Sequence, residues 1–178
     1  MARAFVAVRL PDVVLDAVAE RVAQASMPGR RTTRDQWHVT LQFLGDHADV
    51  DAVAAALDGI DEAGGRAQLG GAGAFPDAAR ARVLWLGFAE GAKALAAVAS
   101  AVAERTASLG HEADPRPFLP HLTLARFRDP ADVRRVIAAF GDEPVGPAWN
   151  LDALTVYESE RLTDGARYTE RARIRLPA

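Results

Sequence analysis

The sequence predicts an α+β chain made of two lobes, each of which places one strand with a His-x-Thr pattern in an equivalent position. Two observations support this prediction. The pattern His-x-Thr-Leu occurs twice, at His38 and at His121, in a chain that has four histidines. The order strand, helix, His-x-Thr strand, helix also occurs twice, beginning near Phe5 and again near Val83. With 178 residues, of which 49% are hydrophobic, the chain fits a single bilobal domain spanning residues 1–178.

In the first half of the chain, strands and helices alternate. The β-branched apolar run Ala4–Leu10 is typical of a strand. A helix is predicted from Asp12, because valines then recur every four residues. The stretch Trp37–Gly45, WHVTLQFLG, predicts the second strand. Asp49 is suited to cap a second helix, which Gly64 and Gly65 would end.

The second half repeats this order and adds strands. Apolar residues at helical spacing over 95–109 predict one helix, and a second has Asp129 as N-cap, Pro130 at its first position and Gly141 after its end. The Gly-rich Leu69–Pro76 fits a strand or a loop, but it lacks the spacing of a phosphate-binding loop. The strand patterns cover Arg82–Phe88, Pro120–Phe127, Leu151–Ser159 and Tyr168–Leu176, the last two around a turn at Thr163–Ala166.

Composition excludes several classes of function. The chain has no cysteine, which excludes disulfides, thiolate zinc sites and a cysteine nucleophile. No apolar run approaches the roughly 20 residues that span a bilayer, so we expect a cytoplasmic protein without membrane contact. The net charge of −3 disfavours broad electrostatic capture of nucleic acid. Arginines nevertheless cluster at Gly29–Arg34 and Ala125–Arg128, beside the two motifs.

The two His-x-Thr motifs provide groups for acid–base chemistry. Residues i and i+2 of a strand share a face, so His38 points with Thr40, and His121 with Thr123. One imidazole can act as base while the other acts as acid, and the hydroxyls can donate hydrogen bonds to an oxyanion. Water and substrate must then supply nucleophile and leaving group, which suits in-line displacement at phosphorus. Alternation places on the opposite, core-facing sides Val39, Leu41, Phe43, Leu122 and Leu124.

The chain resembles the 2H phosphoesterase superfamily, and within it the bacterial RNA 2′,3′-cyclic phosphodiesterases (LigT-like proteins, formerly called 2′-5′ RNA ligases). The resemblance covers nearly the whole chain, through AFVAVRLP, WHVTLQFLG, RPFLPHLTLARF and the closing VYESERLTDGARY. It implies a LigT-like bilobal fold with pseudo-twofold symmetry, a central cleft, and neither metal nor cofactor. It also implies that terminal 2′,3′-cyclic phosphates of RNA or nucleotides are hydrolysed to 2′-phosphates, and we expect a monomer.

The resemblance also implies roles for individual residues. His38 would be the proton donor and His121 the proton acceptor, whereas spacing alone treats the two alike. Thr40 and Thr123 would hold the phosphate oxygens. Arg126 matches an arginine near the phosphate, but strict alternation places it opposite to His121, so it needs strand twist or a bulge. Phe43 also matches a family position near the substrate, although packing in the core is an equal alternative.

Alternative functions remain open at this point. The same catalytic pair would serve hydrolysis of ADP-ribose cyclic phosphate or of a 2′,5′ linkage, or reversible 2′-5′ RNA ligation. A non-catalytic binder of RNA ends would not need intact histidines and threonines in both motifs. A zinc site lacks recognisable ligand spacing. We expect His47 and His111 in solvated loops, and Trp37, Trp85 and Trp149 in the core or at the interface between the lobes. Arg30, Arg31 and Arg34 would either contact RNA or be solvated.

Overall fold

A computed structural model of the chain describes residues 2–163 and 165–177. Its strands form one antiparallel nine-stranded sheet in the order β7-β4-β5-β6-β3-β1-β8-β9, with β2 beside β6. The strands are β1 (Ala2–Arg9), β2 (Arg30–Arg31), β3 (His38–Ala48), β4 (Arg66–Phe75), β5 (Ala81–Glu90), β6 (Leu122–Ala131), β7 (Pro144–Asn150), β8 (Ala153–Leu162) and β9 (Gly165–Arg175). The helices are α1 (Asp12–Gln24), α2 (Val50–Leu57), α3 (Ala92–Ala107), α4 (Arg134–Phe140) and the 3-10 turn η1 (Arg34–Gln36).

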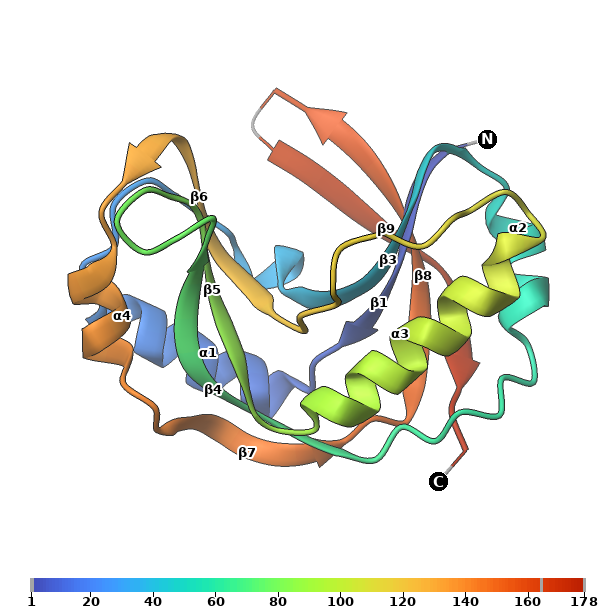
Figure 1. The fold of residues 1–178 in the computed structure, drawn as a ribbon, viewed down its shortest axis with the longest axis horizontal. Coiled ribbons are helices and arrows are strands. Elements are labelled where there is room, and N and C mark those ends of the chain that lie inside the picture. Colours follow the sequence, from blue (N-terminus) through green and yellow to red (C-terminus); the bar gives the residue numbers. More distant parts are fainter. Residues whose placement is uncertain (1, 164, 178) are drawn as a thin grey trace.

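Two lobes share this sheet, as the sequence predicts. The first lobe contains β3, β1, β8 and β9 with α2 and α3, and lies on the right in Figure 1. The second lobe, on the left, contains β7, β4, β5 and β6 with β2, α1 and α4. Between β3 and β6 the ladder pairs Val39 with Leu122, both fully buried. The lobes therefore meet at the centre of both His-x-Thr motifs.

The lobes exchange their first helices. Helix α1 follows β1 of the first lobe but lies against β7 of the second, and α3 follows β5 of the second lobe but lies against β3 of the first. Side-chain hydrogen bonds fix both crossings. Thr106 on α3 donates to the buried Gln42 of β3 (2.8 Å), and Arg21 on α1 donates to the carbonyl of Phe140 (2.7 Å).

Several predicted elements are confirmed. The Asp49 carboxylate accepts hydrogen bonds from the amides of Asp51 and Ala52, so it caps α2. The Gly-rich segment proves to be strand β4, and its composition has a packing reason. Gly73 lies opposite Trp85, and a Cβ on Gly73 would come within 2.3 Å of the indole ring. The missing side chain therefore makes room for the indole.

Other predictions were wrong in detail. Helix α4 begins at Arg134 rather than at Pro130. The reason is that β6 continues to Ala131, which still pairs with β5. Asp132 then turns the chain, and its carboxylate accepts a hydrogen bond from the amide of Arg134. Helix α2 ends at Leu57, well before Gly64 and Gly65. Strand β7 was not predicted. The turn predicted at Thr163–Ala166 includes Asp164, which lies outside the described residues.

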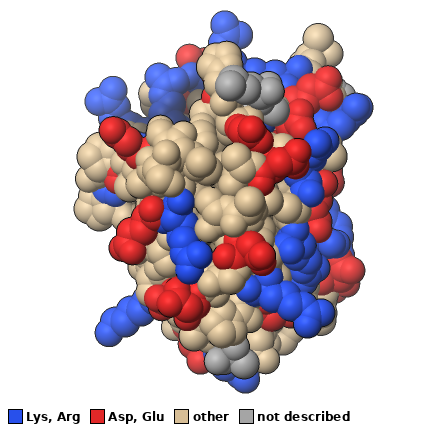
Figure 2. All heavy atoms as spheres, turned by 90° about the vertical axis from the view of Figure 1, so that its right-hand side faces the viewer, with Lys and Arg blue, Asp and Glu red and all other residues tan. Residues whose placement is uncertain are grey.

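The surface carries mixed charge. On the face shown in Figure 2, basic and acidic side chains are interspersed, in agreement with the small net charge. Within the described part of the chain, no helix combines the length and apolar character needed to cross a bilayer.

Candidate active site

The two His-x-Thr motifs lie next to each other in the centre of the sheet. In the first lobe, His38 is paired with Arg9 and Thr40 with Ala7, and all four side chains share one face. In the second lobe, Thr123 is paired with Trp85. Because Val39 and Leu122 are direct partners, the polar residues that flank them are brought together from both lobes. The structure therefore brings the four predicted polar side chains to one place.

Aromatic rings enclose His38. Its imidazole stacks on Phe5 with ring centroids 4.7 Å apart, meets the edge of Tyr168 at 5.0 Å and lies 6.1 Å from Tyr157. This burial lowers the pKa of His38 to about 4, because the charged ring loses water; the nearby charges of Arg126 and His121 act in the same direction. A hydrogen bond to the backbone of Gln36 opposes the shift.

His121 has a similar environment in the second lobe. Its ring meets Phe75 edge-on at 5.1 Å and lies 6.1 Å from Trp85. Burial lowers the pKa of His121, and the charge of Arg126 adds to this effect. Nδ1 lies 2.8 Å from the carbonyl oxygen of Leu119. In the neutral ring Nδ1–H donates to that carbonyl, which leaves Nε2 free for a substrate.

The two histidines are anchored in the same way. His38 is hydrogen-bonded to the backbone of Gln36, and His121 is hydrogen-bonded to the backbone of Leu119. In each case the partner lies two residues earlier in the chain. Each imidazole thus has a fixed orientation, but this arrangement does not distinguish an acid from a base.

Strict alternation predicts Arg126 on the face opposite to His121, but a bulge in β6 changes its side. On β5, Trp85 pairs with Thr123, Leu84 with Ala125 and Val83 with Arg126, so the register shifts by one residue after Thr123. Val83 and Trp85 share a face, and Arg126 therefore shares the face of Thr123. The arginine's contribution to the pKa values of both histidines is consistent with this placement.

A bulge at the same point of β3 corrects the prediction for Phe43. Ala7 pairs with Thr40, but Val6 pairs with Gln42 and Phe5 with Phe43. The shift turns Phe43 onto the face of Thr40, where its side chain is 62% exposed and its ring centroid lies 6.0 Å from that of Phe5. Phe43 is therefore not a core residue. It is the counterpart of Arg126, because each stands three residues after the threonine of its motif.

The aromatic neighbours of the histidines were not predicted as part of the site. They come from strands far apart in the sequence: Phe5, Phe75, Trp85, Tyr157 and Tyr168. The cross-strand rows Tyr157–Phe5–Phe43 and Phe75–Val83–Arg126 correspond between the lobes, but such rows appear only once the strand order is known. Trp37 and Trp149 are buried as expected, whereas Trp85 lies beside the site.

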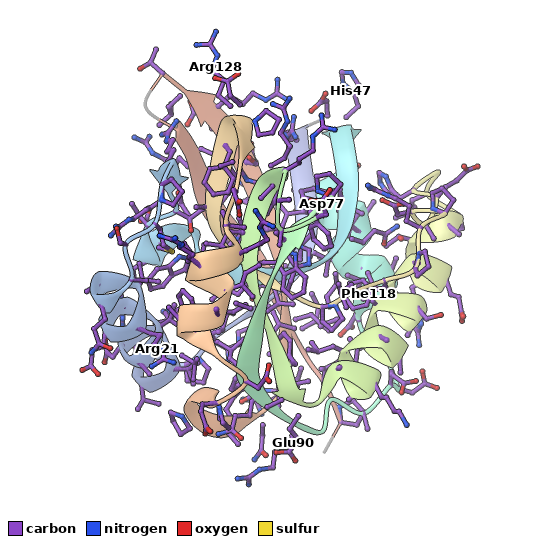
Figure 3. All side chains as sticks on the ribbon, turned by 60° about the vertical axis from the view of Figure 1, so that its left-hand side comes forward. Arg21, His47, Asp77, Glu90, Phe118 and Arg128 are labelled. Atoms are coloured by element: carbon purple, nitrogen blue, oxygen red, sulfur yellow. The ribbon has the colours of Figure 1, made fainter. Side chains whose placement is uncertain are left out.

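The remaining histidines have other surroundings. His47 is exposed at the upper end of β3 in Figure 3, in a strand rather than in the predicted loop. His111 precedes β6, and its carbonyl accepts a hydrogen bond from Gln42. Among the described residues, no group of three or more histidines and carboxylates is placed to hold a metal ion.

The three arginines before β3 have separate positions. Arg34 forms ion pairs with Asp16 (2.6 Å) and Asp12 (3.4 Å) on α1. Arg31 donates to the carbonyl of Ala25. Arg30 lies directly opposite Arg126 in the pairing of β2 with β6. Of the three, Arg30 is therefore the one that adjoins the site.

Comparisons with known proteins agree with this geometry. Residues 4–163 match the sequence profile of the 2'-5' RNA ligase superfamily. The RNA 2',3'-cyclic phosphodiesterase of Aeropyrum pernix is 31% identical over 138 residues, covering 74% of this chain and 78% of the relative. The Escherichia coli enzyme of the same name is 30% identical over 173 residues, covering 94% and 92%.

A solved structure shows the same fold. The crystal structure of E. coli LigT complexed with 3'-AMP matches with a TM-score of 0.78 and 27% sequence identity, covering 99% of this chain and 98% of that one. Two neighbouring His-x-Thr strands in a LigT-like sheet, with sequence similarity along most of the chain, identify the family. The chain belongs to the 2'-5' RNA ligase superfamily, the 2H phosphoesterases.

Proposed function

We propose that this phosphodiesterase hydrolyses terminal 2′,3′-cyclic phosphates of RNA to 2′-phosphates, by acid–base catalysis with two histidines and without a metal. The pairing of both His-x-Thr strands at Val39 and Leu122 is the observation that supports this reaction most strongly. Two imidazoles with fixed orientation face one site from opposite lobes, as in-line displacement at phosphorus requires. Both half-sites belong to one chain, so a monomer is sufficient, and we place it in the cytoplasm.

The reaction can be written through these side chains. His121 takes a proton from water through Nε2 as the water oxygen attacks phosphorus. The bond from phosphorus to the 3′ oxygen breaks, and His38 gives a proton to that oxygen. Thr40, Thr123 and Arg126 hold the non-bridging oxygens, where charge accumulates. The product carries a 2′-phosphate and a 3′-hydroxyl, and the family resemblance supports this choice of donor and acceptor.

The lowered pKa values of the two histidines determine which protonation states the reaction starts from. Burial lowers the pKa of both histidines, which favours a neutral His121 that is ready to act as base. His38 must be protonated to act as acid. A phosphate anion bound between the rings favours the charged imidazole and opposes the effect of burial. Substrate binding would thus supply the charge that makes His38 an acid.

The two bulged positions make the site asymmetric. The exposed ring of Phe43 offers a stacking surface for a nucleobase, whereas Arg126 at the corresponding position offers positive charge for phosphate. We infer that the terminal base lies over the first lobe and the phosphate against the second.

The test is hydrolysis of nucleoside and oligonucleotide 2′,3′-cyclic phosphates in EDTA, with product isomers separated by chromatography. We expect the 2′-phosphate alone, and a loss of about a hundredfold or more in kcat for His38→Ala and for His121→Ala. His47→Ala serves as the matched control. Formation of 3′-phosphate would contradict the assigned regiochemistry, and full activity of both site variants would exclude the mechanism.

A modified substrate separates donor from acceptor. When sulfur replaces the 3′ oxygen of the cyclic phosphate, the leaving group needs no proton. We expect His38→Ala to regain most of its lost rate on this substrate, whereas His121→Ala remains slow. The opposite result would exchange the two roles.

A further inference from the structure

Arg30 stands beside the active site on the short strand β2. It lies directly opposite Arg126 in the antiparallel pairing with β6, so both side chains leave the sheet on the same face. That face also carries His121 and Thr123. The next residue, Arg31, is paired with Ala125 and points to the opposite face, where it donates to the carbonyl of Ala25.

The guanidinium of Arg30 lies close to the first lobe. Its Nη2 lies 2.8 Å from the position that a Cβ on Gly165 would occupy, so the group rests against the β8–β9 hairpin where that residue has no side chain. Gln36 lies beside the same glycine and donates to the carbonyl of Ala166 (3.1 Å). Gln36 is also the residue whose backbone is hydrogen-bonded to His38. Arg30 therefore lies beside the segment that precedes the first His-x-Thr motif.

Two exposed arginines opposite each other form a local concentration of positive charge that favours an anion between or beside them. Like charges at directly paired positions of a sheet repel each other. No carboxylate of the described residues lies within 4.0 Å of the Arg126 guanidinium. Cβ atoms of such a pair are about 5 Å apart, so the two guanidinium groups can hold two neighbouring phosphates. The proposed reaction uses Arg126 for the scissile phosphate and leaves Arg30 for the next one.

We propose that Arg30 binds the phosphate that links the terminal nucleotide to its 5′ neighbour, and so makes the enzyme selective for oligonucleotide ends over mononucleotides. This proposal rests on the proposed function. Farther along β6, Arg128 projects from the upper end of the molecule (Figure 3), so a second basic residue follows Arg126 on this strand.

The test compares three substrates. They are cytidine 2′,3′-cyclic phosphate, a dinucleotide with the same cyclic end, and that dinucleotide with a neutral methylphosphonate linkage. A hydrogen bond between charged partners corresponds to about tenfold to a hundredfold, so we expect wild-type kcat/KM to favour the normal dinucleotide by this factor over the other two. Arg30→Ala should remove the preference and lower the salt dependence on the dinucleotide by about 0.7 in logarithmic slope.

Matched variants make the test specific. Arg31→Ala, one residue away on the other face, should keep the full preference for the dinucleotide. Arg30→Lys should restore part of it, and circular dichroism should confirm that all variants are folded. Equal losses of Arg30→Ala on all three substrates, or an unchanged preference, would overturn the proposal. A wild-type protein that cleaves none of them would instead overturn the proposed function.

Discussion

The low pKa of His38 predicts how stability depends on pH. In the folded protein this pKa is lowered from 6.5 to about 4, chiefly by burial. At about 1.4 kcal/mol for each pKa unit, the difference corresponds to about 3 kcal/mol. Between these values the unfolded chain binds a proton on His38 that the folded protein excludes. The free energy of unfolding should therefore fall as pH decreases from 6.5 to 4, while above 6.5 His38 contributes no pH dependence.

Urea unfolding of wild type and His38→Gln at several pH values between 7 and 4 measures this contribution. Other titrating groups are common to both proteins, so the difference between the two curves isolates His38. We expect wild type to lose up to about 3 kcal/mol more than the variant over this range. Parallel curves for wild type and His38→Gln would refute the claim that the aromatic enclosure keeps His38 neutral.

The low pKa of His38 also limits its ability to act as an acid in the free protein. With a pKa of about 4, roughly one His38 ring in a thousand is protonated at pH 7 in the free protein. An acid at this position therefore needs the bound phosphate to raise its pKa. Titration of the imidazole C–H signals by NMR, with and without 2′-AMP, should show this rise. If His38 remained neutral in the complex while His121 became charged, the donor and acceptor roles would be reversed.

Three further predictions follow from individual contacts. Thr40→Val and Thr123→Val should each lower kcat about a hundredfold with an unchanged Tm, because in the proposed mechanism each removes one hydroxyl donor to the phosphate. A loss of less than about tenfold in steady-state assays would contradict this role. Gly73→Ala should destabilise the fold by about 1–3 kcal/mol in urea unfolding, because the new Cβ would displace the indole of Trp85; unchanged stability and tryptophan fluorescence would show that the ring moves freely. Phe43→Ala should raise KM for nucleotide substrates while leaving Tm within a degree or two, because the ring is largely exposed; an unchanged KM would exclude base stacking there.

The sequence predicts the parts of the site that depend on local alternation. His38 with Thr40, and His121 with Thr123, share a face because two residues of a strand always do. Alternation fails directly after each motif, where one extra residue in β3 and one in β6 shift the register. No turn residue or proline marks these bulges, since they follow from pairing with β1 and β5. The face of the sheet on which Phe43 and Arg126 lie can therefore be predicted only when the neighbouring strands are known.

The fold shows the same division between local and distant effects. The Asp49 cap follows from local chemistry and was predicted, as was the helix beginning at Asp12. Strand β7 has two prolines and Gly146 at φ 76°, so it shows no alternating pattern, and pairing with β4 decides its conformation. The aromatic enclosure of His38 likewise depends on which strands become neighbours. Distant contacts of this kind leave little trace in a single sequence.

The exchanged helices have a consequence for dissecting the chain. Cutting the exposed turn at Asp77, between β4 and β5, would separate the two histidines into two pieces, each holding one half-site. Each piece would also carry a helix that packs on strands of the other: α1 needs β7, and α3 needs β3. Neither piece can bury its apolar faces alone, so the two should assemble only with each other. Recovered phosphodiesterase activity on mixing would then report reconstitution of the pair.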